Sequence, residues 1–248
     1  MGIAGLTVGV DIGGTGIKCA PVDLESGTLA AERIRILTPN PSTPDAVAAA
    51  VKEVLDQVNV PGPVGVTMPS VVTDGLIRTA ANIDKSWIGV DAVHLLVQAT
   101  GRAIAVMNDA DAAGVAEMRY GAGVGRTGTV VMVTLGTGIG SAVFVNGTLV
   151  PNTELGHIHL HHGEAEDWAA ESVRERDDLS WKEYAGRLDD YLNLLQRLLW
   201  PELIIIGGGG SKKADKFLSL LDVGTEVVPA RMQNEAGIIG AAMLAPSA

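Results

Sequence analysis

The sequence predicts an α/β protein built from two similar halves. In the later part of each half, short apolar stretches typical of buried strands alternate with amphipathic stretches typical of helices. Two segments, DIGGTGIK at 11–18 and TLGTGIGS at 134–141, share one pattern. In each, a strand ends, a glycine turn follows, and a second strand begins. A hairpin turn comes after each, ESG at 25–27 and Asn-Gly at 146–147. No Pro-rich or Ser-rich linker separates the halves.

The elements of the first half follow from composition and turn residues. The apolar run 3–12 predicts a buried strand, and 16–37 predicts two more strands joined at ESG. Thr43, with Pro44 at the first helical position, opens a helix over 44–58. Residues 64–69 and 103–108 are strand candidates, with a helix over 91–100 between them.

The second half begins with a helix over 109–121 that ends at Gly121, followed by a strand over 128–135. Ser180 and Glu183 form a capping box that opens a helix. Its apolar residues recur at spacings near three and four, which predicts a face packed in the core: Trp181, Tyr184, Leu188, Tyr191, Leu192, Leu195 and Leu199. Residues 202–221 predict strand, glycine turn and helix, and 234–245 a final helix.

Composition limits the classes of function. The 248 residues are 47% apolar and 19% charged, as in globular proteins. The net charge of −11 argues against broad nucleic-acid binding, which needs a basic surface. The single cysteine, Cys19, excludes an internal disulfide framework and fits a reducing compartment. No signal peptide and no apolar run of about 18 residues is present, so we expect a cytoplasmic protein that does not enter a membrane.

The two glycine turns are candidates for phosphate binding. Rossmann and Walker loops lead into a helix, whereas both turns here lead into hairpins, which weakens those interpretations. A glycine turn between strands can still direct backbone N–H groups at an anion. Lys18 and the hydroxyls of Thr15 and Thr137 would add charge and donors. A single turn would more often be structural, but the pair together with IIIGGGGSKK favours phosphate binding.

Five motifs in order, DIGGTGIK, NDADAAG, LGTGIG, ELGH and IIIGGGGSKK, resemble the ROK sugar kinases, which have the hexokinase/actin-like fold. The strings TAANIDKSW, AEMRYGAG, LVPNTELGH, RERDDLSW and GSKKADKFL are similar to the actinobacterial branch that phosphorylates glucose or mannose with polyphosphate or ATP. The resemblance implies two similar actin-like domains around a cleft, residues 1–107 plus 231–248 and residues 108–230. It also implies Mg²⁺ as cofactor, polyphosphate or ATP as donor, glucose as acceptor and a homodimer.

The resemblance assigns the sugar site. Asp109, at a strand-to-helix junction, would take the proton from the 6-hydroxyl of glucose, although its position alone fits a helix N-cap equally well. Sugar-binding residues would be Asn82, Asn108, Asp109, Glu154, His157 and Glu166. Glu171 is a rival to Glu166, and Asn82 fits a structural role as well.

The resemblance also assigns the donor site. Phosphate-binding residues would be Asp11, Gly13, Gly14, Thr15, Gly16 and Lys18 in the first loop, Gly136, Thr137 and Gly138 in the second, and Gly208, Gly209 and Lys212 in the third. Asp11 would position Mg²⁺ directly or through water. Lys212, Lys213 and Lys216 would form a basic face for a polyanion, or simply a solvated helix face.

The segment after His157 departs from the wider family. Many ROK proteins carry a cysteine-rich zinc loop there, and this chain has no cysteine in it. Four histidines gather instead: His157, His159, His161 and His162. Alternate residues on a strand and a loop rarely form a closed tetrahedral site, so we do not expect structural zinc.

The sequence leaves three alternative functions open. One is a strictly ATP-dependent ROK glucokinase or hexose kinase. The second is a ROK-type sugar-responsive regulator, which would need an N-terminal helix-turn-helix, whereas the sequence starts on a predicted strand. The third is a non-catalytic sugar-binding module, which the phosphate loops and the candidate base argue against.

Overall fold

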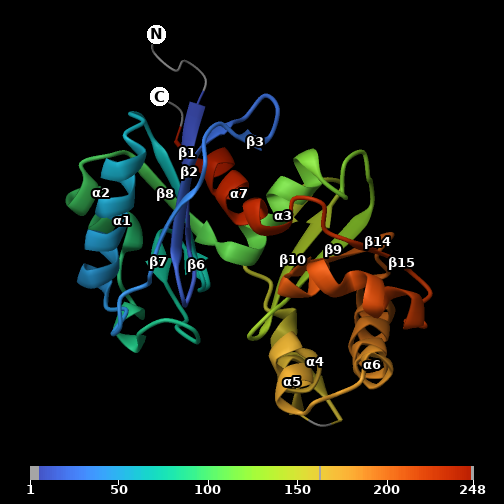
Figure 1. The fold of residues 1–248 in the computed structure, drawn as a ribbon. Coiled ribbons are helices and arrows are strands. Elements are labelled where there is room, and N and C mark those ends of the chain that lie inside the picture. Colours follow the sequence, from blue (N-terminus) through green and yellow to red (C-terminus); the bar gives the residue numbers. More distant parts are fainter. Residues whose placement is uncertain (1–5, 162, 247–248) are drawn as a thin grey trace. The chain divides into compact units, whose positions relative to one another are not determined.

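The computed structural model describes residues 6–161 and 163–246. The chain divides into two compact units. Unit 1 comprises Met1–Ala116 with Glu235–Ala248, and unit 2 comprises Glu117–Asn234. Helix α3 (Asp109–Tyr120) begins in unit 1 and ends in unit 2 (Figure 1).

Unit 1 is built around a mixed sheet with the strand order β3-β2-β1-β5-β8, and β4 pairs with β2. Its strands are β1 (Leu6–Ile12), β2 (Ile17–Asp23), β3 (Thr28–Leu29), β4 (Ile34–Ile36), β5 (Val64–Met68) and β8 (Ile104–Asn108). Strands β1 and β2 form an antiparallel hairpin, whereas β5 is parallel to β1 and β8 is parallel to β5. The first glycine turn is therefore the hairpin turn at the end of β1, as predicted.

Helices cover both faces of this sheet. Helices α1 (Pro44–Val58) and α2 (Ala92–Thr100) lie on one face, and α7 (Ala236–Leu244) lies on the other (Figure 1). Two glycines allow α7 to approach the strands closely. A Cβ added to Gly9 would lie 1.9 Å from the carbonyl oxygen of Ile238, and one added to Gly65 would lie 1.6 Å from that of Ala241. Backbone therefore packs on backbone at both points.

Two short strands and a 3-10 helix of unit 1 lie outside its main sheet. Strands β6 (Val72–Thr73) and β7 (Leu76–Ile77) make a short hairpin, followed by the 3-10 helix Lys85–Trp87. The fully buried indole of Trp87 donates a hydrogen bond from Nε1 to the carbonyl oxygen of Ser42, 2.9 Å away. This contact fixes the loop that precedes α1.

Unit 2 repeats the arrangement of the first sheet. Its strand order is β11-β10-β9-β14-β15, with β11 (Thr148–Val150), β10 (Ile139–Val145), β9 (Thr129–Leu135), β14 (Leu203–Gly208) and β15 (Glu226–Pro229). Strands β9 and β10 form an antiparallel hairpin and β14 is parallel to β9, as β1, β2 and β5 are in unit 1. The two similar halves predicted from the glycine turns are confirmed.

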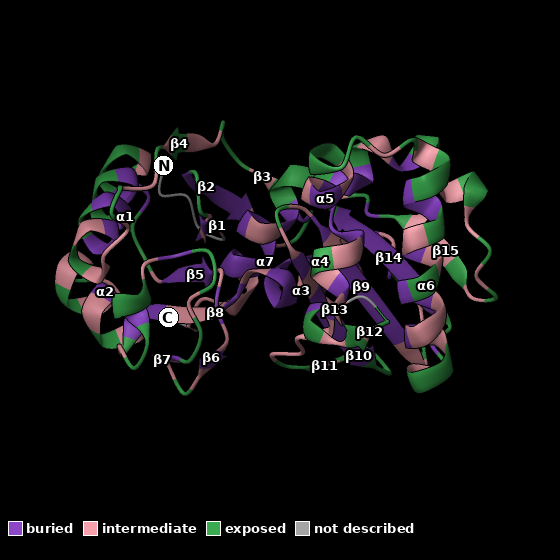
Figure 2. Ribbon diagram, turned by 90° about the horizontal axis from the view of Figure 1, so that it is seen from below, coloured by how far each residue is buried: buried purple, intermediate pink, exposed green. Residues whose placement is uncertain are grey.

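Within the described residues, the rest of unit 2 forms a small hairpin, three helices and short 3-10 helices, the last of which ends in unit 1. The hairpin pairs β12 (His159–Leu160) with β13 (Gly163–Glu164), and the helices are α4 (Ala165–Ala169), α5 (Glu171–Arg176) and α6 (Trp181–Leu199). The 3-10 helices are Leu155–His157, Gly209–Lys216, Leu218–Leu220 and Gln233–Glu235. In each unit the central strands, β1 and β5 or β9 and β14, are mostly buried, and α1 and α6 each expose one face (Figure 2). Helix α7 has no exposed residue.

Several local predictions are confirmed. Ser180 and Glu183 form both hydrogen bonds of the capping box that opens α6. The stripe of α6 is core, with Tyr184, Leu188 and Tyr191 among its buried residues. Asn146 and Gly147 both have positive φ, 49° and 78°, as a two-residue hairpin turn of type I′ requires.

The helix predicted after β14 is wrong in type. Residues Gly209–Lys216 form a 3-10 helix, followed by a second one over Leu218–Leu220. Gly208 has a φ of 69°, outside the helical region. Each glycine of the run also loses more backbone entropy in an α-helix than any other residue would. The tighter 3-10 turn results, and 3-10 helices of this length are uncommon.

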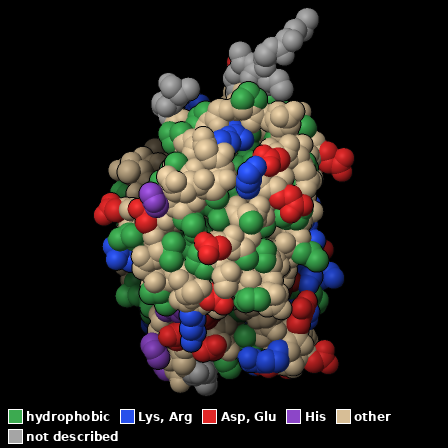
Figure 3. Space-filling view, turned by 90° about the vertical axis from the view of Figure 1, so that its left-hand side faces the viewer, with side chains coloured by type: hydrophobic (Ala, Val, Ile, Leu, Met, Phe, Trp, Pro, Cys, Tyr) green, Lys and Arg blue, Asp and Glu red, His purple; other side chains and the backbone are tan. Residues whose placement is uncertain are grey.

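No helix in the described ranges is long and apolar enough to cross a membrane. Over the face drawn in Figure 3, acidic and basic side chains are interspersed.

Candidate active site

In unit 1, Asp11 is the anchor of the first glycine turn. The β1–β2 register places Asp11 opposite Lys18, and their side chains form an ion pair with Oδ2 and Nζ 2.8 Å apart. The hydroxyl of Thr67 donates to the other carboxylate oxygen over 3.0 Å. A Cβ on Gly237 would lie 3.1 Å from the Asp11 carboxyl carbon, so the first turn of α7 abuts this carboxylate. The positive end of the α7 dipole therefore lies beside this carboxylate.

The turn itself is closed by backbone contacts. The Gly13 N–H donates to the carbonyl oxygen of Gly16 over 3.0 Å, and Thr38 Oγ1 donates to the Gly13 carbonyl oxygen over 2.5 Å. The exposed Asn82 has its backbone beside Gly14, because a Cβ there would lie 3.2 Å from the Asn82 carbonyl oxygen. The structure therefore places the backbone of Asn82 at the first glycine turn of unit 1.

Arg35 is a residue that the sequence analysis missed. It lies opposite Lys18 in the β2–β4 register, and its guanidinium donates to the carbonyl oxygen of Thr15 over 3.2 Å. A Cβ on Gly16 would lie 2.7 Å from Arg35 Nε, so the guanidinium covers the glycine turn. The sequence signal for it is the alternation of apolar and basic residues in Ile34–Ile36, the strand that pairs with the strand of Lys18.

Asn108 and Asp109 lie where β8 ends and α3 begins. Asn108 is the residue that caps the helix: its Oδ1 accepts hydrogen bonds from Ala110 N (2.8 Å) and Asp111 N (3.0 Å). Its Nδ2 donates to the carbonyl oxygen of Ser70 over 3.2 Å. Asp109 is half-buried in the first turn, and its Oδ1 also accepts from Ala110 N over 2.8 Å. The helix cap is thus provided by Asn108, and the capping role does not explain Asp109.

In unit 2 two glycine turns lie side by side at the carboxyl ends of the neighbouring strands β9 and β14. The β9–β14 register pairs Gly207 with Thr134 and Gly208 with Leu135, so the 136–138 turn and the 208–210 turn leave the sheet together. The first turn is closed by a hydrogen bond from Gly136 N to the Gly138 carbonyl oxygen over 3.0 Å. Its outer edge is held by α5, where Ser172 Oγ donates to the Thr137 carbonyl oxygen over 2.6 Å.

Part of the expected basic face is neutralised by acidic neighbours. Lys213 Nζ lies 2.6 Å from Glu171 Oε1 and 3.1 Å from Glu175 Oε1. These hydrogen bonds, led by the one to Glu171, raise the pKa of Lys213 above its usual value. Lys216 lies over the ring of Trp181, with Nζ 5.4 Å from the ring centroid. Lys212 is exposed.

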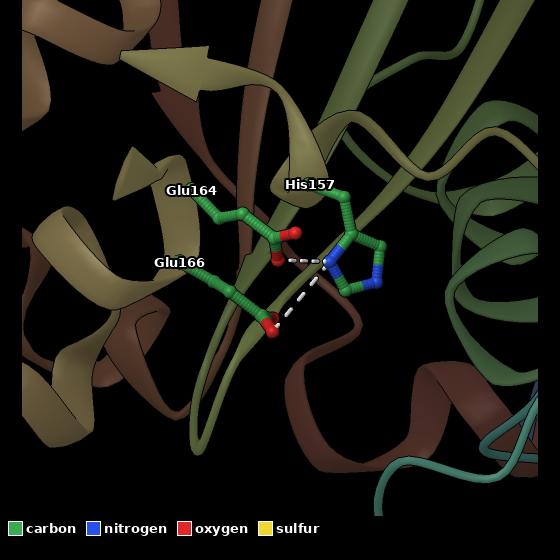
Figure 4. Close-up of side chains that lie close together, drawn as sticks. All are labelled: His157, Glu164 and Glu166. Atoms are coloured by element: carbon green, nitrogen blue, oxygen red, sulfur yellow. Dashed lines mark hydrogen bonds and ion pairs between the residues drawn. The ribbon is translucent and has the colours of Figure 1, made fainter. Parts of the chain in front are cut away.

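A second polar cluster in unit 2 gathers around His157, the last residue of the 3-10 helix Leu155–His157 (Figure 4). Its Nδ1 lies 2.7 Å from Glu164 Oε2 and 3.7 Å from Glu166 Oε1, and its Nε2 lies 3.7 Å from Glu154 Oε2. Burial raises the pKa of Glu154, and the hydrogen bond to Glu164 raises the pKa of His157.

This cluster separates the two glutamates that the sequence left as rivals. Glu166 Oε2 accepts a hydrogen bond from Ile139 N over 3.2 Å, and a Cβ on Gly138 would lie 2.4 Å from the same oxygen. Glu166 therefore lies between His157 and the glycine turn. Glu171 contacts Lys213 instead, and a Cβ on Gly209 would lie 2.6 Å from Glu171 Oε2.

The four histidines do not act together in the described part of the chain. His159 and His161 are exposed. The side chains close enough together to hold a metal ion are those of His157, Glu164 and Glu166, whose ligand atoms lie within 4.8 Å of one another. That separation would suit a cation, but the hydrogen bond between His157 and Glu164 is sufficient to account for it. The side chain of His162 lies outside the described residues.

The fold and these motifs define a class of protein. The profile of the ROK family matches residues 7–170, and the chain belongs to that family. Its fold is the actin-like α/β fold of the ROK sugar kinases.

Among particular relatives, the chain is 52% identical over 236 residues to the polyphosphate glucokinase of Mycobacterium tuberculosis, a match that covers 95% of this chain and 89% of the relative. The crystal structure of the inorganic polyphosphate/ATP-glucomannokinase from Arthrobacter sp. strain KM superposes with a TM-score of 0.93 at 50% identity, covering 96% of this chain and 97% of that one. A ROK family glucokinase from Streptomyces griseus, solved with glucose and AMPPNP, gives a TM-score of 0.82 at 27% identity, covering 97% and 99%.

Proposed function

We propose that this protein is a polyphosphate-dependent glucokinase, which transfers a terminal phosphoryl group to the 6-hydroxyl of glucose and also accepts ATP. The observation that carries the proposal is the cluster of Glu154, His157 and Glu166 directly beside the 136–138 glycine turn. Side chains able to bind sugar hydroxyls and a glycine turn able to bind phosphate therefore lie next to each other in unit 2. The relatives named as polyphosphate glucokinases, at 52% and 48% identity, support the same donor and acceptor.

Asp109 is the proposed general base. A carboxylate at this junction accepts the proton of the sugar 6-hydroxyl as the oxygen attacks the terminal phosphorus atom. The phosphoanhydride bond to the next phosphate breaks, and the donor shortened by one phosphate, or ADP, leaves. Asn108 holds the junction in place through its cap of α3 and its hydrogen bond to Ser70.

The glycine turns are the proposed phosphate cradles. Transfer of a phosphoryl group needs little covalent chemistry from the protein, so positioning and charge supply most of the rate. In unit 1, backbone N–H groups of the 13–16 turn, with Lys18 and Arg35, would bind phosphate. In unit 2, backbone N–H groups of the 136–138 turn would do the same. An exposed guanidinium over the turn suits a chain of phosphates, which continues where the phosphates of ATP end.

Asp11 is the proposed partner of Mg²⁺. Its carboxylate supplies the hard oxygen ligands that this ion prefers, and it lies at the head of a phosphate turn. The ion would supply charge neutralisation at the phosphates when bound. Asp11 also fixes Lys18 through their ion pair.

Location and assembly are part of the proposal. The single buried Cys19 fits the reducing cytoplasm. A homodimer would cover apolar side chains such as Leu198 and Trp200 at the end of α6, which are 58% and 78% exposed. Light scattering on the purified protein measures its mass and tests the dimer.

A strictly ATP-dependent glucokinase is the second candidate. The observation that favours it is the neutralised Lys213, because Glu171 and Glu175 reduce the positive potential available to a long polyanion. The test is a coupled assay for glucose 6-phosphate with Mg²⁺ and one donor at a time. Turnover with nucleotide-free polyphosphate supports the main proposal, and turnover with ATP alone supports the second.

A further inference from the structure

We propose that Glu164 is a positioning residue that holds His157 as the Nδ1–H tautomer and so makes Nε2 a hydrogen-bond acceptor for a sugar hydroxyl. The inference rests on the proposed function, because it takes His157 to be a sugar-binding residue. Glu164 is not among the residues that the sequence motifs point to. It is assigned here from its contact with the ring.

The hydrogen bond between the two side chains determines where the ring proton lies. His157 Nδ1 and Glu164 Oε2 are 2.7 Å apart, a distance typical of a charge-assisted bond. An ionised carboxylate can only accept, so the nitrogen must carry the hydrogen. In a neutral imidazole the other nitrogen, Nε2, then has the lone pair.

The backbone fixes both partners in this relationship. Glu164 ends β13, which pairs with β12, and His157 ends the 3-10 helix immediately before β12. Between them, Ala165 N donates to the Ile158 carbonyl oxygen over 2.9 Å. Ala165 follows Glu164 and Ile158 follows His157, so this hydrogen bond holds the backbone of the two partners together. The positions from which their side chains meet are thereby fixed.

The neighbouring glutamates do not replace Glu164 in this role. Glu166 Oε1 is 3.7 Å from Nδ1, beyond a hydrogen bond, and Glu166 Oε2 already accepts from Ile139 N. Nε2 lies on the far side of the ring from Glu164 and Glu166 (Figure 4). Glu154 Oε2 is 3.7 Å from Nε2, so it does not take a hydrogen from that nitrogen.

The consequence is a surface made of acceptors. Nε2 of His157 and the carboxylates of Glu154 and Glu166 can each accept a hydrogen bond from a hydroxyl. A polyhydroxy ligand with its O–H groups directed at them satisfies all three. With the opposite tautomer, Nε2–H would present a donor to the same hydroxyl and require it to rotate.

The test compares Glu164→Ala and Glu164→Gln with the wild type, and uses Glu226→Gln as the matched control. Glu226 is a half-exposed glutamate of unit 2 with one ion-pair partner, Arg126, 2.9 Å away. Two quantities are measured on the full chain. Both are measured at a pH above the raised pKa of His157, where the ring is neutral. ¹⁵N NMR of the imidazole identifies the protonated nitrogen, and steady-state kinetics separate the KM for glucose from kcat.

We expect Nδ1–H in the wild type and Nε2–H in Glu164→Ala. The KM for glucose should rise about tenfold in Glu164→Ala, as loss of one hydrogen bond to the sugar would give, with kcat within about twofold. Glu164→Gln can still accept from Nδ1–H through its amide oxygen, so it should keep the wild-type tautomer and most of the affinity. The Glu226→Gln control should match the wild type in both measurements.

The proposal is overturned if Glu164→Ala keeps both the Nδ1–H tautomer and the wild-type KM. If Glu164→Ala does not fold, a wild-type ring with Nε2–H overturns it equally, since that tautomer cannot donate from Nδ1. A wild-type protein that does not phosphorylate glucose refutes the proposed function instead. The NMR result then still shows whether Glu164 sets the tautomer.

Discussion

Glu171 and Lys213 form an ion pair 2.6 Å long, and this contact assigns Glu171 to the glycine turn after β14 rather than to the His157 cluster. The carboxylate is largely buried, with 11% of its side chain exposed, so it is held at this place. The glutamate beside His157 is Glu166. Two glutamates five residues apart thus lie beside different glycine turns, Glu166 beside 136–138 and Glu171 beside 208–210.

The first prediction separates these two glutamates. Glu166→Gln should raise the KM for glucose about tenfold, because it removes a charged acceptor for a sugar hydroxyl. Glu171→Gln should leave the KM for glucose within about twofold and lower the KM for polyphosphate, because it releases the charge of Lys213. Steady-state kinetics with each substrate varied will measure both. A rise in the KM for glucose in Glu171→Gln alone would reverse the assignment.

The second prediction concerns Asp109. Asp109→Asn keeps the size of the side chain and its hydrogen bond to Ala110 N but removes the base. Turnover should fall about 10²- to 10⁴-fold, the usual contribution of general acid–base catalysis, while glucose binding measured by calorimetry is retained. Because Asn108 caps α3, the thermal midpoint should change little. Turnover close to wild type would remove Asp109 from the mechanism.

The third prediction concerns Arg35 and the donor. Arg35→Ala should raise the KM for long-chain polyphosphate at least severalfold more than the KM for ATP, because the guanidinium over the 13–16 turn would contact phosphates beyond those that ATP has. Lys52→Ala is the control, since Lys52 is an exposed cation of α1 paired with Asp56. Equal changes for both donors in Arg35→Ala would show that Arg35 only supports the turn.

The fourth prediction is a pH dependence of stability. The folded-state pKa of His157 is raised, chiefly by Glu164, so folding favours the protonated ring. This contribution is fully present below the unfolded-state pKa of about 6.5 and is lost as the pH rises through the raised folded-state pKa. Urea unfolding of wild type and His157→Gln from pH 5.5 upward should show a stability difference that shrinks above that point. A difference that grows with pH would contradict the contact.

The fifth prediction concerns the approach of α7 to the sheet. Gly65→Ala should destabilise unit 1 by several kcal/mol or prevent folding, because its Cβ would overlap the Ala241 carbonyl oxygen at 1.6 Å. Gly186→Ala is the control: Gly186 lies within α6 and its Cβ would meet no atom within 4 Å. That substitution should stabilise by about 0.5–1 kcal/mol. Equal effects in urea unfolding would contradict the packing of α7.

The sequence predicts the sheet frameworks well because their signals are local. Glycine turns followed by strands, the Asn146-Gly147 dipeptide and the Ser180–Glu183 capping box each determine structure within a few residues. The 3-10 helix after β14 was not predicted, because apolar spacing alone does not distinguish a 3-10 helix from an α-helix in a glycine-rich segment.

Contacts between distant elements account for what the sequence misses at the site. Arg35 reaches the first glycine turn only because β4 pairs with β2, and Glu164 reaches His157 only because β12 and β13 form a hairpin. The choice between Glu166 and Glu171 depends on which turn each side chain faces. The identity of the helix cap is another such case, since Asn108 and Asp109 are both good capping residues.

The central claim is transfer of a phosphoryl group from polyphosphate to glucose by this chain. The most direct measurement is ³¹P NMR of purified protein with glucose, Mg²⁺ and nucleotide-free polyphosphate. The account predicts that a phosphomonoester signal of glucose 6-phosphate grows with wild type and stays near background with Asp109→Asn. A wild-type sample that forms inorganic phosphate alone, or no product, would contradict it.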